Sequence, residues 1–384
     1  MKFHTTIYSN KLFAKSIRHF FFIFLFIGMI ASGCFYLFYS YQSKEFVHDL
    51  LVREESGVAL RKTVIEDSLN VVVSDLEFLA TLDSMRAFAE GVSGSNARVE
   101  KDFLAFSKAK GTYDQVRLFD TKGVEVVRIN NDNGFPSIAP REKLQNKYKR
   151  YYFKDTIEMK VGGVFVSPMD LNIENGEVEI PYNPVIRFGT PLYGQNGSAV
   201  GALILNYKAD NLLGMLRKTG SITNGQSMLV NKRGYWLLAP DLVDQWAFMF
   251  EDRKNISFAE RYPKLWSRIR SSESGQIVTG NQIFTYTTVY PLDVQFLSST
   301  GSGDAFEESK GGVRSDQYYW KLISFVPNSA NQGYTKPILV KIFIVGAMLF
   351  FFAGGLAWFV TLILAGRVIS IGPCEECAGE ENDE

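Results

Sequence analysis

Three arginines stand inside stretches that otherwise read as strands. Arg187 lies in the middle of PVIRFG, while Arg117 and Arg128 lie in QVRLFD and VEVVRIN. A charged side chain in such a stretch must be paired or must face a cavity, because burying it alone is costly. These arginines therefore either bind a ligand or pair with acidic side chains on a solvated sheet face. The candidate acidic partners of Arg128 and Arg187 are Glu125, Glu177 and Glu179.

Other groups that could do chemistry are sparse. Cys374 and Cys377 form a C-x-x-C pair, but one pair supplies two thiolates and a structural zinc site needs four ligands. Two tails of a dimer could together supply four, yet we interpret the pair as incidental. The sequence contains no G-x-S-x-G, H-E-x-x-H or P-loop motif. We therefore expect no enzyme activity, no metal site and no cofactor.

Composition excludes further classes of protein. The chain has 41 basic and 41 acidic residues, and this net charge of zero argues against a nucleic-acid partner, which would require a basic face. Hydrophobic residues make up 46% and charged residues 21%, which predicts a packed core rather than disorder. Only three cysteines and three histidines are present, so neither a disulfide scaffold nor a histidine-rich metal enzyme is expected.

Two apolar runs near the ends predict membrane-spanning helices at 20–42 and 336–366. The first run is longer than the apolar region of a signal peptide and ends in aromatic residues, so we interpret it as a retained anchor. Residues 1–19 carry basic residues and no acidic ones, which places the N-terminus in the cytoplasm. The predicted location is a bacterial inner membrane crossed twice, with the region between the spans in the periplasm or outside.

The region between the spans predicts a long helix followed by two similar α+β modules. Apolar residues recur at helical spacing over 43–91, and a second helix is predicted at 97–110. Strand pairs flank the turns at 121–123 and 194–197. A helix is expected at 141–159 and another at 256–270, and residues 298–317 are expected to form a mobile loop. The pattern of strand, glycine turn and strand restarts at 227.

These motifs resemble a known family. YDQVRLFDTKGVEVVRIN, KLQNKYKRYYF and VFVSPMDLNIENGEVEIPYNPVIRFGTPLY are similar to the first strands, the pocket-side helix end and the following strands of one sensor type. That type is the double Cache (tandem PAS-like) sensor domain of bacterial transmembrane receptors, and the resemblance covers about residues 43–330. It implies a membrane-distal module at 92–222 that binds a small ligand. It further implies a proximal module at 223–335 that passes the signal inward.

The resemblance also implies roles for individual residues. Amino-acid-binding members have Arg-x-Trp-Tyr where this chain has Arg150, Tyr151, Tyr152 and Phe153, so Arg150 would hold a carboxylate and Tyr152 would cover the ligand. The change from Trp-Tyr weakens the specific case for amino acids. Asp170 would receive an amine, or it caps a turn instead. The predicted ligand-binding residues are Arg117, Arg128, Arg150, Tyr152, Asp170, Asn172 and Arg187.

The predicted protein is thus a sensor for a carboxylate- or amine-bearing small molecule, working as a homodimer. Residues 367–384 are acidic and too few for a domain, which needs about 40 residues. We therefore expect no output domain in this chain and a cytoplasmic or membrane signalling partner. The alternative is a non-catalytic membrane protein whose outer modules bind another protein.

Overall fold

The computed structural model describes residues 2–132, 134–174, 176–219, 225–280, 282–292, 298–299 and 315–369. The chain forms two compact units, one of residues 1–49 with 329–384 and one of residues 50–328. The predicted loop at 298–317 is wrong at its two ends, because residues 298–299 pair as a strand and residues 315–317 form a single helical turn. Its residues 300–314 and the tail from 370, including Cys374 and Cys377, lie outside the described residues.

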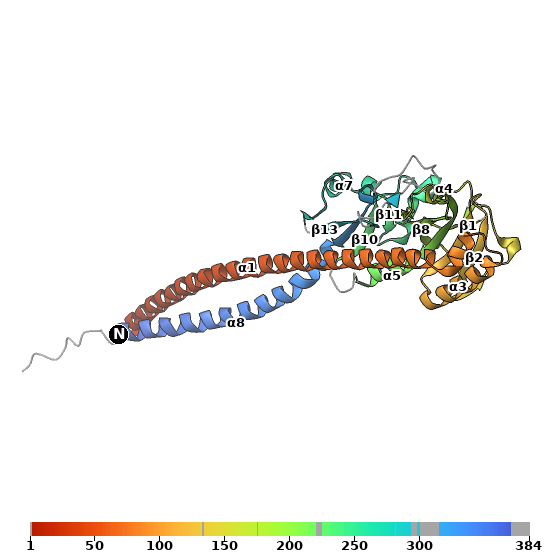
Figure 1. The fold of residues 1–384 in the computed structure, drawn as a ribbon. Coiled ribbons are helices and arrows are strands. Elements are labelled where there is room, and N and C mark those ends of the chain that lie inside the picture. Colours follow the sequence, from red (N-terminus) through yellow and green to blue (C-terminus); the bar gives the residue numbers. More distant parts are fainter. Residues whose placement is uncertain are drawn as a thin grey trace, which may run out of the picture. The chain divides into compact units, whose positions relative to one another are not determined.

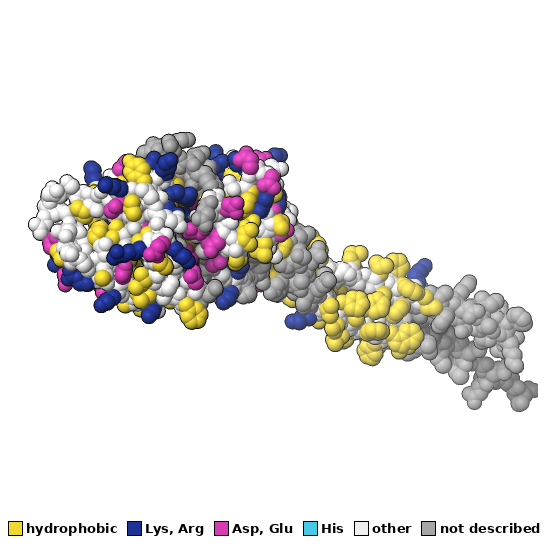
Figure 2. Space-filling view, turned by 90° about the vertical axis from the view of Figure 1, so that its right-hand side faces the viewer, with side chains coloured by type: hydrophobic (Ala, Val, Ile, Leu, Met, Phe, Trp, Pro, Cys, Tyr) yellow, Lys and Arg dark blue, Asp and Glu magenta, His cyan; other side chains and the backbone are white. Residues whose placement is uncertain are grey.

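The first unit consists of two apolar helices. They are the first part of α1 (Lys2–Ala80) and most of α8 (Asn328–Ile369), and each contains a stretch long and apolar enough to cross a membrane. Phe20 packs edge-on against Trp358, and Phe24 packs edge-on against Phe350. Hydrophobic side chains gather on this unit, whereas charged side chains are interspersed over the other (Figure 2).

The second unit contains the sensor-like fold, with α1 continuing into it (Figure 1). The predicted helix at 43–91 is interrupted. α1 ends at Ala80, Leu82 is extended, and a separate helix covers the following residues. The break allows Leu79 before it and Met85 after it to enter the same buried cluster. The other helices of this unit are α2 (Asp83–Ala89), α3 (Ser95–Lys110), α4 (Tyr151–Ile157), α5 (Ala209–Thr219), α6 (Phe258–Arg261) and α7 (Pro263–Arg270).

An eight-stranded sheet occupies one part of the unit. Its order is β14-β4-β8-β9-β1-β2-β3, with β5 paired to β8, and all pairs are antiparallel except β14 with β4. Both predicted hairpins are confirmed as β1–β2 and β8–β9. The strands are β1 (Tyr113–Asp120), β2 (Glu125–Asp132), β3 (Phe135–Ile138), β4 (Val164–Val166), β5 (Asp170–Leu171), β8 (Pro184–Tyr193), β9 (Ala199–Lys208) and β14 (Ser298–Ser299).

A five-stranded antiparallel sheet follows in the order β11-β10-β15-β13-β12. The predicted helix at 256–270 is divided, because Pro263 cannot continue α6 and instead begins α7. The strands are β10 (Gln226–Asn231), β11 (Trp236–Leu238), β12 (Ser274–Thr279), β13 (Gln282–Val289) and β15 (Trp320–Val326). A short ribbon and five single turns complete the unit: β6 (Ile173–Glu174), β7 (Glu177–Val178), η1 (Arg141–Lys143), η2 (Leu242–Asp244), η3 (Ala247–Met249), η4 (Glu251–Arg253) and η5 (Ser315–Gln317).

One hydrophobic cluster joins α1 to both sheets. Ile65 and Leu69 of α1 are buried with Leu203 of the larger sheet and Leu322 of the smaller one. The predicted fold class, α+β with a long helix and two PAS-like modules between two apolar helices, is confirmed. The module boundaries near residue 222 stay predictions, since residues 50–328 form one compact unit.

Candidate ligand-binding site

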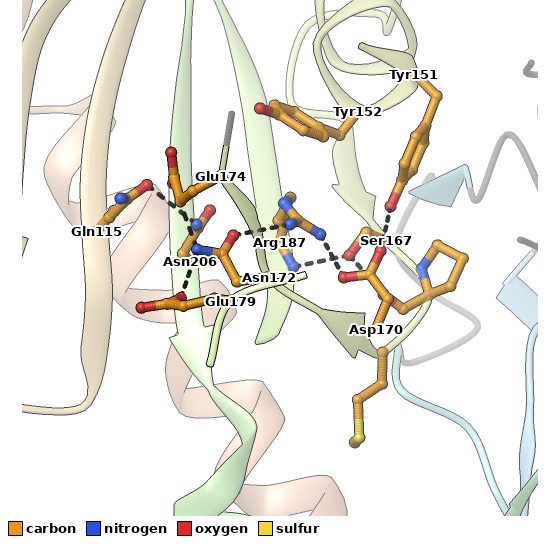
Figure 3. A network of polar contacts seen from close by, with 12 residues as sticks. Gln115, Tyr151, Tyr152, Ser167, Asp170, Asn172, Glu174, Glu179, Arg187 and Asn206 are labelled. Carbon is orange, nitrogen blue, oxygen red and sulfur yellow. Dashed lines mark hydrogen bonds and ion pairs between the residues drawn. The ribbon is translucent and has the colours of Figure 1, made fainter. Parts of the chain in front are cut away.

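The candidate site lies where α4 and the loop before it cover the larger sheet. α4 approaches β8 so closely that a Cβ atom at Gly189 would collide with the side chain of Thr156. Within α4, the Thr156 hydroxyl donates to the Tyr152 carbonyl (2.6 Å). The sheet supplies polar side chains from β1, β5, β8 and β9 beneath this helix (Figure 3).

Arg187 is the centre of the buried polar network. Its exposed fraction is 2%, and its guanidinium donates to Asp170 (2.7 Å) and Asn172 (3.3 Å). Asp170 also accepts a hydrogen bond from the Tyr151 hydroxyl (3.2 Å), which points at it in Figure 3. Burial alone would lower the pKa of Arg187, but Asp170 and the two tyrosines raise it, so Arg187 remains a cation. Burial raises the pKa of Asp170 despite the opposing charge of Arg187.

Tyr152 presents its ring to three guanidinium groups. The centres of Arg187, Arg117 and Arg150 lie 5.0, 5.3 and 5.6 Å from the ring centroid, within range of cation–π attraction. The Arg117 guanidinium also donates to the Tyr152 hydroxyl (3.3 Å). Burial would raise the pKa of that hydroxyl, but the charges of Arg117, Arg187, Lys147 and Arg150 lower it below its usual value. Tyr152 therefore lies in a strongly positive environment.

The Glu125 carboxylate offsets the positive charges of Arg117 and Arg128. It accepts from Arg128 (2.8 Å) and lies 3.6 Å from Arg117, and all three side chains are buried. The predicted pairing of Arg128 with Glu125 is thus present, in a buried position rather than on a solvated face. Arg187 pairs with Asp170 instead of Glu177 or Glu179, because Asp170 stands beside it on paired strands.

The loop before α4 is held against the first hairpin. The predicted helix at 141–159 is wrong: only η1 and α4 are helical, and the residues between them bond to the β1–β2 turn. Lys147 donates its backbone N–H to the Gly123 carbonyl (2.7 Å), and the Gln145 N–H bonds to the Glu125 carboxylate (2.9 Å). Gly123 has φ of 73°, and a Cβ there would collide with Tyr148. This position therefore requires glycine.

An open cavity of about 580 Å³ lies beside this loop. Arg150 lines it and also contacts the Tyr152 ring, so the cavity adjoins the buried network. The residues around it are Gln145, Asn146, Lys147, Tyr148, Lys149, Arg150, Ile173 and Gly176.

The structure brings six of the seven predicted site residues into one network and places Arg128 at its edge. Among the described residues, Glu125 is what links Arg128 to the network. Sequence reasoning missed Tyr151 and Asn206, which bond to Asp170 and to Arg117. A signal for Asn206 exists, since it is the one amide within the apolar run SAVGALILNY. Within the described residues, no cluster of His, Cys, Asp and Glu could hold a metal ion.

Comparison with known proteins gives a family match. The family model described as bacterial histidine kinase, sensor domain, matches residues 65–295. The extracellular domain of vpHK1S-Z8, assigned as a histidine kinase, is similar with a TM-score of 0.63 and 19% identity, over 75% of this chain and 95% of that one. A domain of a Vibrio parahaemolyticus protein, assigned to the sensory box/GGDEF family, is similar with a TM-score of 0.62 and 19% identity. That likeness covers 74% of this chain and 99% of the Vibrio domain. These two likenesses concern the fold. No curated protein sequence matches the chain.

Proposed function

Because the chain belongs to the family of bacterial histidine kinase sensor domains, we propose that it is a two-pass sensor of the inner membrane. It binds a small ligand outside the cytoplasm and passes the signal inward through α1 and α8 to a cytoplasmic or membrane signalling partner. The observation that carries this proposal is the cavity of about 580 Å³ beside a buried network of arginines and aromatic rings. An open cavity there supports a small ligand over the alternative of a protein partner.

A ligand screen tests the proposal. The full chain in detergent micelles is heated with a library of amino acids, organic acids, amines, sugars and nucleosides. At least one compound is expected to raise the unfolding midpoint, because a ligand that binds only the folded chain stabilises it. The stabilisation should weaken in Arg150→Ala. A library that shifts no midpoint, or a shift that Arg150→Ala leaves unchanged, contradicts the proposed site.

A contact between the two sheets supports transmission of the signal. The Met169 N–H, next to Asp170, donates to the Tyr318 hydroxyl (3.2 Å), and Trp320 Nε1 donates to the same hydroxyl (3.1 Å). Trp320 begins β15, and the chain leaves β15 directly into α8. A ligand that moves the Asp170 segment would therefore act on the strand that precedes α8.

We expect Tyr318→Phe to keep the affinity for a ligand from the screen within about threefold, since Tyr318 does not line the cavity. Loss of the hydroxyl removes the acceptor shared by Met169 and Trp320. Ligand-dependent hydrogen-exchange protection of β15 should therefore fall. Tyr319→Phe is the control at the neighbouring residue. If β15 in Tyr318→Phe responds as in the unchanged chain, the contact is not the route.

A second apolar row on α1 supports a homodimer. Leu60, Val71 and Phe78 are 66, 53 and 58% exposed, and Val64 is half-buried between them. With Asp67 and Ser74 these residues follow the alternating three- and four-residue spacing of a helix–helix seam. The row faces away from the core, whereas Val58 and Ile65 face into it.

Val71→Cys, in a chain whose native cysteines are changed to serine, is expected to cross-link between copies in membranes. In a two-fold dimer each residue of a central seam meets or nearly meets its own copy. Ile65→Cys is the control, because its side chain is fully buried. Equal cross-linking at both positions, or none at Val71, contradicts a dimer through this row. Electrophoresis without reductant gives the readout.

A further inference from the structure

The cations at the cavity form no ion pair with any acidic side chain that the structure describes. Lys147, Lys149 and Arg150 line the cavity, and none of their side chains forms a hydrogen bond or ion pair among the residues that the structure describes. The Arg150 guanidinium lies over the Tyr152 ring, and its charge also acts on the buried Asp170 without a hydrogen bond to it. The described residues that line the cavity include no aspartate or glutamate. Its wall therefore carries three positive charges that no described carboxylate pairs with directly.

The neighbouring carboxylates are already engaged. Asp170 accepts from Arg187 and Tyr151, and Glu125 accepts from Arg128 and a backbone N–H. Acidic groups on the Asn172 side are likewise bonded to side-chain amides. Asn172 donates to Glu174 (3.4 Å) and Glu179 (3.0 Å). Among the buried oxygens of these described carboxylates, only Glu125 Oε1 is without a hydrogen-bond partner, and it lies 3.6 Å from Arg117. A ligand ammonium would thus compete with the protein's own cations and amides for these carboxylates, whereas a ligand anion would not.

Positive charge continues from the cavity into the protein. Behind Arg150, the Tyr152 ring contacts Arg117 and Arg187 as well. The Nε atoms of these two arginines are buried and have no hydrogen-bond partner among the described residues. Buried donors without partners are costly, and an oxyanion that reaches them removes that cost.

We propose that the ligand of this site is a small dianion, a dicarboxylate or a phosphate, recognised without an ammonium group. Lys147, Lys149 and Arg150 bind the charge at the cavity, and the positive field of Arg117 and Arg187 adds to the attraction. Asp170 serves to hold Arg187 in place rather than to receive an amine. This inference rests on the proposed sensor function and specifies its ligand class.

Three four-carbon probes that differ only in their end groups test the assignment. Succinate has two carboxylates, 4-aminobutanoate has one carboxylate and one ammonium, and 1,4-diaminobutane has two ammonium groups. Binding to the full chain in micelles is measured by calorimetry, with inorganic phosphate as a fourth probe that distinguishes a phosphate from a dicarboxylate. Succinate or phosphate is expected to bind more tightly than either amine, and its affinity should fall as salt is added.

Charge-removing variants locate the binding. Arg150→Gln is expected to weaken the preferred anion about tenfold, because one charged hydrogen bond is lost. Lys149→Gln should weaken it less, since Lys149 is exposed. Lys101→Gln, at an exposed position of α3, is the matched control and should change nothing.

Two outcomes overturn the anion assignment. One is tighter binding of 4-aminobutanoate or 1,4-diaminobutane than of succinate and phosphate. The other is no binding of either anion. In both cases, a compound from the wider screen that stabilises the chain and depends on Arg150 leaves the sensor proposal standing. Failure of every compound in the screen contradicts the sensor proposal as well.

Discussion

Arg187→Met is expected to lower the free energy of unfolding by about 3 kcal/mol, because it leaves Asp170 buried without its cation. The loss includes the hydrogen bond to Asn172, whose amide oxygen then has no donor from Arg187. Chemical denaturation of the full chain in micelles measures the change. Arg98→Met is the control, since Arg98 is exposed on α3.

A double variant distinguishes the loss of the ion pair from the cost of leaving one buried charge unpaired. Replacing both members, as in Arg187→Met with Asp170→Leu, removes the unpaired charge and should restore most of the lost stability. Ligand binding should remain impaired in the double variant, because the positive field behind Tyr152 is weakened. A single variant that loses less than about 1 kcal/mol would contradict the view that this pair is buried and coupled.

Glu125→Ala is expected to cost about 3 kcal/mol or more, since it leaves Arg117 and Arg128 buried with no carboxylate between them. It also removes the acceptor of the Gln145 N–H, which anchors the cavity loop. Denaturation gives the stability change, and hydrogen exchange at 145–150 should become faster. Glu142→Ala, at an exposed position of η1, should leave both unchanged.

Glu125→Gln divides the two roles of this residue. The amide retains an oxygen that can accept from Gln145 but has no charge for the arginines. Hydrogen exchange at 145–150 should then be as slow as in the unchanged chain, while the free energy of unfolding still falls. Fast loop exchange in Glu125→Gln would show that the backbone bond is not what anchors the loop.

Local patterns predicted much of the fold and less of the site. The β1–β2 hairpin followed from Gly123 and alternating residues, and the divided helix at 256–270 could have been read from Pro263. The prediction of a helix at 141–159 was wrong, because the backbone at 145 and 147 bonds to the β1–β2 hairpin, a contact that a local pattern cannot record. The same cause hid the pairing of β14 with β4, which depends on long-range contacts that no local pattern records.

The candidate site was likewise predictable only in part from local sequence patterns. A lone arginine in an apolar strand correctly predicted that Arg187 is paired or faces a cavity. Its partner was not predictable, since Asp170 meets it only through the register of β5 on β8. Tyr151 and Tyr152 are adjacent in sequence, and only the helix geometry decides that Tyr151 faces Asp170 and Tyr152 faces the arginines.

Hydrogen exchange of the full chain, with and without the most stabilising compound of the screen, tests the central claim most directly. The account predicts ligand-dependent protection at 145–153 and 167–172, around the cavity and the Arg187 network, together with a change in β15. Protection confined to β10–β13, or a compound that stabilises the chain without protecting 145–153, would contradict a ligand site at the cavity beside the loop before α4.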